Sequence, residues 1–195
     1  MSEDKSRLAK IFASSREART GLGARHCPVE IGLERYTYGR MGESFTIREY
    51  RRSDFSRLWE IDQKCFPPGI SYSQPELLFY MRRPRAFTLV AESPGEDSSV
   101  AGFIVAEAAR VGHIITIDVL QEFRRNGLGS QLMAAAEDRL RTEGCRSVIL
   151  ETAVDNATAL AFYKRHQYFL AKTIPRYYAT GVDAFVLKKD LLSKE

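Results

Sequence analysis

The stretch that decides the fold is Ile114-Ile-Thr-Ile-Asp-Val-Leu-Gln-Glu-Phe-Arg-Arg-Asn-Gly-Leu-Gly-Ser130. An isoleucine-rich strand runs into a glycine-rich turn that opens a helix, so unpaired backbone N–H groups and the positive end of the helix dipole converge on one spot. Gly127 and Gly129 let phosphate oxygens approach this backbone without meeting a Cβ atom. Arg124 and Arg125 add positive charge beside it. The stretch therefore predicts a turn that binds a phosphate or diphosphate group.

Two familiar phosphate-binding motifs do not fit this turn. A Walker A loop needs Gly-x-x-x-x-Gly-Lys-Ser/Thr, which the chain lacks, and a dinucleotide fingerprint needs a third glycine where this chain has Leu132. Taken alone, the turn has a simpler alternative, an ordinary strand-to-helix corner in which glycine only helps the chain to change direction.

The regions on both sides of the turn show strand and helix patterns. Strands are expected at 45–50, 86–92, 100–109, 112–120, 147–152, 168–174 and 183–188. Helices are expected from a cap at Ser53 or Asp54 up to Pro67, from Ser73 to Pro84, from the glycine turn to Gly144, and from Asp155 or Asn156 to about His166. The strand at 112–120 is poor in charge, which predicts burial on both of its faces. The pattern indicates a mixed α/β fold.

The bulk composition points to one domain with an extension. At 195 residues and 44% hydrophobic content, the chain can bury one full core but not two. Residues 1–44 are polar and interrupted by glycines, so we expect an N-terminal extension, partly helical or disordered, followed by one domain at 45–195. The N-terminus lacks the apolar core of a secretory signal, and no apolar run approaches the ~18 residues of a membrane span.

Cysteine and charge usage exclude several classes of function. Cys27, Cys65 and Cys145 are odd in number and lack metal-ligand spacing, which argues against a disulfide framework or a zinc site and favours a reducing cytoplasm. The formal net charge of +4 comes from cations spread along the chain rather than gathered in blocks. We therefore expect no bound metal, no membrane partner and no nucleic-acid partner.

A second motif follows the glycine turn at 151–169, with the sequence Glu-Thr-Ala-Val-Asp-Asn-Ala-Thr-Ala-Leu-Ala-Phe-Tyr-Lys-Arg-His-Gln-Tyr-Phe. Together, the Arg-x-x-Gly-x-Gly turn and this block resemble the two signature motifs of the GNAT superfamily of N-acetyltransferases. The resemblance covers roughly residues 45–191 as judged by motif order. One departure is Gln167, which stands where the family usually has glycine and puts the turn into the last hairpin in doubt.

Within this superfamily the chain is most similar to the RimI-like and eukaryotic N-terminal (Nα) acetyltransferases. The features that carry this similarity are Cys65-Phe-Pro-Pro68 with Tyr72-Ser73, the spacing Glu151…Asn156…Tyr163, and Arg176-Tyr-Tyr178 followed by Asp183-Ala184. The resemblance implies the GNAT fold, a central, mostly antiparallel twisted sheet of about 6–7 strands with about four flanking helices, splayed at the acetyl-CoA site.

The resemblance also implies that acetyl-CoA is the acyl donor and CoA a product. The residues that match cofactor positions of the family are Ile117, Asp118, Val119, Arg124, Arg125, Asn126, Gly127, Leu128, Gly129, Ser130, Asn156 and Tyr163. Read without the resemblance, Asn156 is a helix N-cap, and the two roles are compatible.

Three residues match catalytic positions of the family. Glu151 looks like the glutamate that RimI-like enzymes use as proton acceptor, although it could also be a strand-end carboxylate held by a salt bridge. His113 stands where a related N-terminal acetyltransferase has a tyrosine that handles the catalytic water, so it is a second candidate base, with a plain surface histidine as the alternative. Tyr163 matches the general acid for the CoA thiolate, and its alternative is an aromatic residue packed in the core.

For the acceptor, the resemblance implies two loops that flank a peptide N-terminus. The matching residues are Phe66, Pro67, Pro68, Tyr72 and Tyr178, with Tyr177 as the alternative inward-facing tyrosine. Aromatic rings and a proline turn would form a small apolar slot with hydroxyl groups for peptide carbonyls.

The implied acceptor is the N-terminus of a protein or peptide, such as a ribosomal protein, and the implied assembly is a monomer or a homodimer. A small amine is the alternative acceptor, but these loops lack the acidic cluster that would favour it. A non-catalytic domain that binds acyl-CoA is the other alternative, and the presence of both Glu151 and Tyr163 counts against it.

Overall fold

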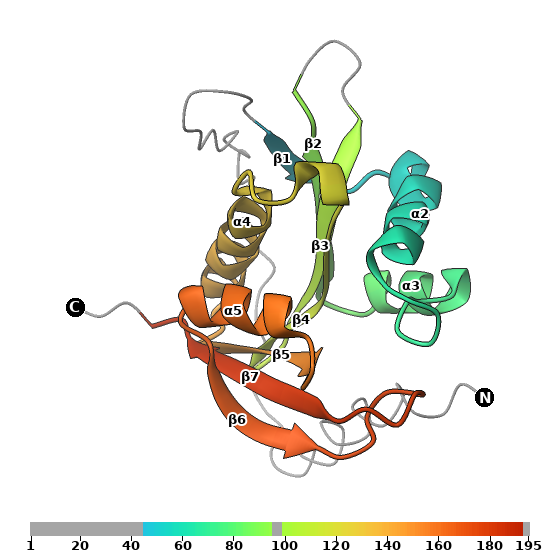
Figure 1. Ribbon diagram of the computed structural model, residues 1–195. Coiled ribbons are helices and arrows are strands. Elements are labelled where there is room, and N and C mark those ends of the chain that lie inside the picture. Colours follow the sequence, from blue (N-terminus) through green and yellow to red (C-terminus); the bar gives the residue numbers. More distant parts are fainter. Residues whose placement is uncertain (1–44, 95–98, 193–195) are drawn as a thin grey trace. The chain divides into compact units, whose positions relative to one another are not determined.

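The computed structural model of the protein describes residues 45–94 and 99–192, all within one compact unit of the chain. The extension expected at 1–44 lies outside the described residues. Seven strands form one sheet in the order β1-β2-β3-β4-β5-β7-β6, and helices cover it (Figure 1). Among the strands of these described residues, only β4 and β5 pair in parallel. The expected mixed α/β fold with a mostly antiparallel sheet is confirmed.

The described elements follow the expected order along the chain. The strands are β1 (Thr46–Glu49), β2 (Ala86–Glu92), β3 (Val100–Ala108), β4 (Gly112–Val119), β5 (Ser147–Ala153), β6 (Phe169–Ile174) and β7 (Ala184–Asp190). The helices are α2 (Phe55–Cys65), α3 (Gln74–Met81), α4 (Leu128–Thr142) and α5 (Ala157–Arg165), with short 3-10 helices η1 (Arg52–Asp54) and η2 (Gln121–Phe123). The helix expected to reach Pro84 ends at Met81, because a proline disfavours helical backbone at the residue before it.

Local side chains explain where the helices begin. Ser73 and Glu76 form a capping box at α3, in which the Ser73 N–H donates to the Glu76 carboxylate at 2.9 Å. Of the two expected caps for α5, Asn156 is the one used, because its Oδ1 accepts the Ala159 N–H at 3.1 Å. These contacts involve near neighbours in the chain, which is why the sequence pattern could predict them.

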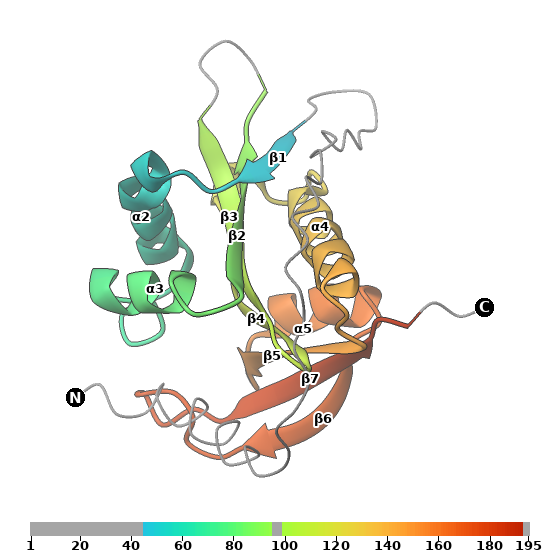
Figure 2. The same cartoon turned by 180° about the vertical axis from the view of Figure 1, so that it is seen from behind.

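The helices cover both faces of the first half of the sheet. α4 lies on one face of β2–β4, and α2 and α3 lie on the opposite face (Figures 1 and 2). The apolar side chains of α4 form one buried stripe, which consists of Leu128, Leu132, Met133, Ala136 and Leu140. Burial of each leucine is worth about 2 kcal/mol, so this stripe holds the start of α4 firmly against the sheet.

The expectation that β4 is buried on both faces is wrong. Ile114, Thr116 and Asp118 are buried, whereas the alternate positions from His113 to Val119 are only half-buried. The cause is the geometry of the neighbouring strand β5. It pairs with β4 only at Gly112↔Val148 and His113↔Ile149, so it leaves the rest of β4 without a partner on that side.

The separation of β4 from β5 splays the sheet in its middle. In Figure 1, β5 and β7 run across the direction of β3 and β4. A β-bulge lies just beyond the last β4–β5 pair, because Val105↔Thr116 is followed by Ala106↔Ile114 and Ile115 is the extra residue. Bulges of this kind disrupt the ladder and re-aim backbone groups and side chains, often next to active sites.

Two helices end in the same backbone motif but with different residues. At the end of α4 the Cys145 N–H donates to the Leu140 carbonyl at 2.9 Å, and Gly144 has φ +83°. At the end of α5 the Tyr168 N–H donates to the Tyr163 carbonyl at 3.0 Å, and Gln167 has φ +67°. Both are Schellman motifs. The turn that the departure at Gln167 put in doubt is therefore formed, with glutamine in the left-handed conformation.

Candidate active site

The turn between β4 and α4 has the backbone geometry of an anion site. Gly127 is the N-cap of α4 with φ +81°, and no side chain of the described residues caps this helix start. The first backbone N–H groups of α4 are therefore available to an outside acceptor. A Cβ atom at Gly127 would meet no described atom within 4 Å, so the backbone angle rather than packing requires glycine there.

The turn carries exposed polar side chains and one core residue. Arg124, Arg125 and Asn126 are exposed. The Arg124 Nε–H donates to the Val119 carbonyl at 2.8 Å and so lies over the end of β4. Leu128 is only 1% exposed and faces the core, so it can offer a ligand nothing but its backbone.

The β4 residues predicted at the cofactor site are placed differently from one another. Ile117 and Val119 are half-buried. Asp118 is fully buried, and its carboxyl accepts the Thr116 hydroxyl at 2.8 Å. Burial, followed by the charge of Asp62, raises the pKa of Asp118 well above its usual range. Its side chain lies in the interior, so only its backbone is available to a cofactor.

The two candidate bases form one hydrogen-bonded pair. His113 Nε2 lies 2.7 Å from Glu151 Oε2, with the side chains 17% and 7% exposed. The pair bridges β4 and β5 at the position where the two strands begin to separate. The other carboxylate oxygen, Oε1 of Glu151, is buried and has no hydrogen-bond partner among the described residues. A buried acceptor without a partner is costly unless a ligand or a water satisfies it.

Tyr163 lies on α5, its side chain is buried, and Glu151 is among the charges that act on it. Burial is the main cause that raises the pKa of Tyr163, and the neighbouring Tyr178, Asp118 and Glu151 raise it further. The phenol is therefore protonated at neutral pH and can act as a proton donor. The same residue packs against the core through Phe162 and Tyr168, so the functional and the structural interpretations of Tyr163 are compatible.

The two loops predicted to bind the acceptor approach each other. A Cβ atom at Gly69, in the loop after α2, would lie 3.8 Å from the Thr180 side chain in the loop between β6 and β7. Pro67 and Pro68 are exposed and Phe66 is half-buried. Burial, and then the charges of Glu151 and Asp155, raise the pKa of Tyr178, which places Tyr178 in the field of the candidate base.

Tyr72 is anchored by side chains of α2 that the sequence analysis did not identify. Its N–H donates to Asp62 at 2.7 Å, and its carbonyl accepts from Trp59 Nε1 at 3.2 Å and from Gln63 Nε2 at 2.8 Å. Its hydroxyl lies 3.5 Å from the carbonyl of the bulge residue Ile115. Asp62 was detectable in principle, because a carboxylate within the apolar stripe of α2 is unusual without a dedicated partner.

Tyr80 is another residue of this region that the sequence analysis missed. Its ring lies 5.3 Å from that of Tyr72, and Glu151 is among the charges that act on it.

Within 45–94 and 99–192, no three His, Cys, Asp or Glu side chains come together as metal ligands do. Among the helices of the described part, none combines the length and apolar character that a membrane crossing requires.

The uncapped start of α4 and the pair of His113 and Glu151 both lie along β4, where it separates from β5. Residues 55–168 match the family described as acetyltransferase (GNAT), and the chain belongs to this family. The resemblance stated from the two motifs is thereby confirmed. The protein is an N-acetyltransferase that takes the acetyl group of acetyl-CoA and transfers it to an amine.

Known proteins of similar sequence and structure lead to the same family. An N-alpha-acetyltransferase of Saccharolobus solfataricus is 26% identical over 164 residues, which are 77% of this chain and 95% of that protein. The crystal structure of Ard1 from Thermoplasma volcanium is 31% identical with a TM-score of 0.69, covering 76% and 99% of the two chains. The ribosomal-protein-S18-alanine N-acetyltransferase of Escherichia coli shares the fold with a TM-score of 0.68 at 21% identity, over 77% and 96%.

Proposed function

We propose that this protein acetylates the N-terminal α-amine of a protein or peptide. The observation that carries the proposal is the 2.7 Å pair of His113 and Glu151. The pair lies where β4 and β5 separate, and the charge of Glu151 acts on Tyr178 of the acceptor loop between β6 and β7. The similarity to an N-alpha-acetyltransferase along 95% of its length supports this choice of acceptor.

In this proposal the diphosphate of acetyl-CoA binds at the start of α4. The uncapped N–H groups after Gly127 would hold its oxygens, and the exposed Arg124 and Arg125 would add charge. The further cofactor contacts proposed are those of Ile117, Asp118, Val119, Asn126, Leu128, Gly129, Ser130, Asn156 and Tyr163. Acetyl-CoA supplies an acetyl group already activated as a thioester.

The pair of His113 and Glu151 would remove the proton from the attacking amine. An α-amine has a pKa of about 8, so a fraction of about one tenth is neutral at pH 7 without help. A weak base at the site is therefore sufficient, acting directly or through a water that also satisfies the unpaired Glu151 Oε1. Tyr163, held protonated by its burial, would donate a proton to the departing thiolate.

The acceptor peptide would lie between the two loops that approach each other at Gly69 and Thr180. Tyr72 and Tyr178 would offer hydroxyl groups to its backbone, and Phe66, Pro67 and Pro68 would line its path. We further propose that residues 45–195 form the catalytic domain. A cytoplasmic location is part of the proposal, because Cys65 and Cys145 are free thiols.

An acceptor panel tests this proposal. CoA release from acetyl-CoA would be measured with peptides that have a free N-terminus, with the same peptides blocked at the N-terminus but carrying lysine, and with a polyamine. We expect turnover with free N-termini alone. Turnover confined to the polyamine would contradict the proposed acceptor and keep the enzyme class, whereas turnover confined to the blocked peptides would identify a lysine acetyltransferase.

A further inference from the structure

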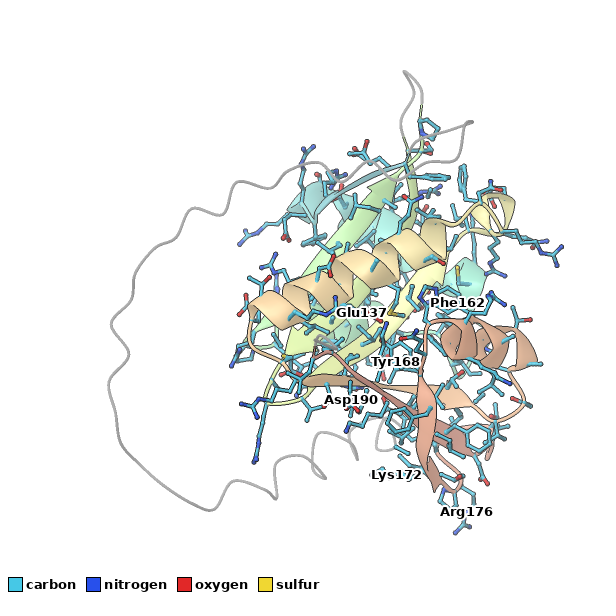
Figure 3. All side chains as sticks on the ribbon, turned by 90° about the vertical axis from the view of Figure 1, so that its left-hand side faces the viewer. Glu137, Phe162, Tyr168, Lys172, Arg176 and Asp190 are labelled. Carbon is cyan, nitrogen blue, oxygen red and sulfur yellow. The ribbon has the colours of Figure 1, made fainter. Side chains whose placement is uncertain are left out.

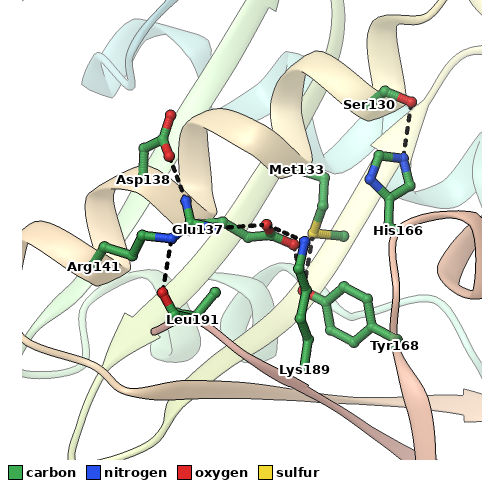
Figure 4. Close-up of polar contacts among 9 residues, drawn as sticks. All are labelled: Ser130, Met133, Glu137, Asp138, Arg141, His166, Tyr168, Lys189 and Leu191. Atoms are coloured by element: carbon green, nitrogen blue, oxygen red, sulfur yellow. Dashed lines mark hydrogen bonds and ion pairs between the residues drawn. The ribbon is translucent and has the colours of Figure 1, made fainter. Parts of the chain in front are cut away.

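The start of α4 is backed by the end of α5. His166 Nε2 lies 2.9 Å from Ser130 Oγ, and Ser130 is the third residue of α4 (Figure 4). The His166 ring packs on Phe162 with ring centroids 4.5 Å apart, and a Cβ atom at Gly129 would lie 3.4 Å from the Phe162 ring. Figure 3 shows Phe162 on α5 at the side where that helix faces α4. Phe162 of α5 and His166 at the end of that helix thus lie against Gly129 and Ser130 of the predicted phosphate turn.

The contact between Ser130 and His166 controls one hydroxyl proton. A serine hydroxyl has a single proton, and an imidazole nitrogen either donates or accepts. When Nε2 of His166 is unprotonated, it accepts the Ser130 proton, and Ser130 turns only lone pairs toward an anion. When Nε2 carries a proton, as in the imidazolium and in the neutral Nε2–H tautomer, it donates to Ser130 Oγ, and the hydroxyl proton becomes free for a phosphate oxygen. The state of Nε2 therefore decides whether Ser130 attracts or repels an anion at the helix start.

We infer that His166 is a positioning residue for the diphosphate of the acyl donor, because its protonated Nε2 orients the Ser130 hydroxyl toward that group. The inference rests on the proposed placement of the diphosphate at the start of α4. It adds a residue whose sequence position, at the end of α5, is remote from the Arg-x-x-Gly-x-Gly turn. It also adds a dependence of donor affinity on pH.

The surroundings of His166 set the direction of this pH dependence. Burial lowers the pKa of His166, Glu137 on α4 raises it, and Lys189 on β7 and Arg165 on α5 lower it further. The carboxylate of Glu137 is itself engaged by Lys189 Nζ at 2.6 Å and by the Tyr168 hydroxyl at 3.0 Å (Figure 4). The net effect lowers the pKa of His166, which favours the neutral ring in the free protein.

An arriving diphosphate favours the imidazolium form, because a nearby anion raises the pKa of a histidine. Binding therefore takes up a proton. By linkage, donor affinity is highest below the pKa of His166 in the free protein and falls as pH rises through the pKa in the complex. The effect is electrostatic, so it requires the diphosphate and not the pantetheine arm.

Titration calorimetry with 3′-dephospho-CoA tests the inference. This ligand keeps the diphosphate but lacks the 3′-phosphate, a monoester that itself titrates near about pH 6. We expect the affinity of the wild-type protein to rise by about 3- to 10-fold between about pH 8 and pH 5. The heats in two buffers of different ionisation enthalpy should show proton uptake. Acetylpantetheine, which has no diphosphate, should bind with no such pH dependence.

Variants separate the proton from the packing. His166→Gln keeps a partner for the Ser130 hydroxyl but cannot titrate, so its affinity at about pH 8 should stay within about twofold of the wild type while the pH dependence disappears. Ser130→Ala should also remove most of the pH dependence. Lys172→Gln, at an exposed position of β6, removes one positive charge elsewhere and should keep the wild-type dependence.

Three results would overturn the inference. These are a wild-type protein that binds 3′-dephospho-CoA without proton uptake, a pH dependence that persists in His166→Gln, and equal losses of 3′-dephospho-CoA and acetylpantetheine binding in that variant. The last result would mean that His166 only holds the two helices together. A different result would show that the diphosphate does not bind at the start of α4. In that case Gly127→Ala and Arg124→Ala would leave the affinity for 3′-dephospho-CoA unchanged.

Discussion

The two ends of the proposed site are built in opposite ways. At the donor end, the helix start at Gly127 uses backbone N–H groups from one short stretch of chain, and its flanking side chains are exposed. At the acceptor end, His113, Glu151 and Tyr163 come from β4, β5 and α5 and are largely buried. The donor end therefore depends on local backbone conformation, and the acceptor end depends on how distant elements pack.

This contrast explains why the two ends should respond differently to substitution. A backbone site tolerates most side-chain changes but not a change that alters its left-handed residue. A side-chain site loses function when one group is removed, even if the backbone does not move. We expect the largest effects from substitutions at the acceptor end.

The largest effect is expected from Glu151→Gln. The change removes the proton acceptor but keeps the size of the side chain, so kcat should fall by about 10²- to 10⁴-fold with little change in the KM for acetyl-CoA. Steady-state kinetics with a free-N-terminus peptide measure both constants. Glu60→Gln, at an exposed position of α2, is the matched control and should retain wild-type kcat. Wild-type kcat in Glu151→Gln would show that the acceptor end does not use this carboxylate.

The next effect is expected from Tyr163→Phe. The loss of the phenol proton should lower kcat by about 10²-fold while the fold is retained. In the wild type, the rate should rise as the acceptor α-amine loses its proton near about pH 8. It should not fall by about pH 10, the ordinary pKa of tyrosine, because burial raises the pKa of Tyr163 and keeps it protonated. An alkaline fall centred near that ordinary value would contradict the assignment.

A matched set of glycine variants can distinguish the two ends directly. Gly127, Gly181 and Gly144 have φ of +81°, +82° and +83°, and a Cβ atom at any of them would meet no described atom within 4 Å. Alanine at each should cost about 1–2 kcal/mol of backbone strain. In Gly127→Ala the free turn can relieve this strain by leaving the conformation that holds the diphosphate. Binding must then restore that conformation, so the KM for acetyl-CoA should rise by about tenfold.

The other two glycines complete this comparison. Gly181 lies in the loop between β6 and β7, so Gly181→Ala should raise the KM for the peptide and leave that for acetyl-CoA unchanged. Gly144 lies at the opposite end of α4 from Gly127 and outside the acceptor loops. Gly144→Ala should therefore lower only the free energy of unfolding, by about 1 kcal/mol in thermal or urea unfolding. The same KM changes in all three variants would mean that the two ends are not separable.

The smallest effect is expected from Arg124→Ala. This exposed guanidinium donates to the Val119 carbonyl and adds one positive charge near the proposed diphosphate. Its removal should raise the KM for acetyl-CoA by only about three- to fivefold, because exposed charges are screened. The difference from the wild type should shrink when the salt concentration is raised. An effect of Arg124→Ala larger than that of Gly127→Ala would reverse our account of the donor end.

Much of the fold was predictable because its determinants are local. Examples are the start of α3 at Ser73 and the end of α4 at Gly144. In both cases the residues that decide the helix boundary lie within a few positions of it. The error at β4 has the opposite origin. Its burial depends on β5, and the local composition of β4 contains no information about where β5 separates from it.

The candidate site divides in the same manner. The glycine turn was recognisable from its own residues, and Glu151 and Tyr163 from the resemblance, yet nothing in the sequence placed His113 against Glu151, which are 38 residues apart. The anchoring of Tyr72 by Asp62 and the contact of His166 with Ser130 were missed for this reason. Each depends on two segments whose relative position is set by tertiary packing.

By itself, the sequence determined the order of the elements, the turn at Gly127 and the family to which the chain belongs, because backbone preferences and short motifs act between near neighbours. The tertiary structure alone decided which side chains meet at the splayed strands and which carboxyl groups are buried. It also decided that His166 lies behind the predicted phosphate turn. Side-chain contacts between distant segments are set by the packing of the whole core, in which every element constrains the others.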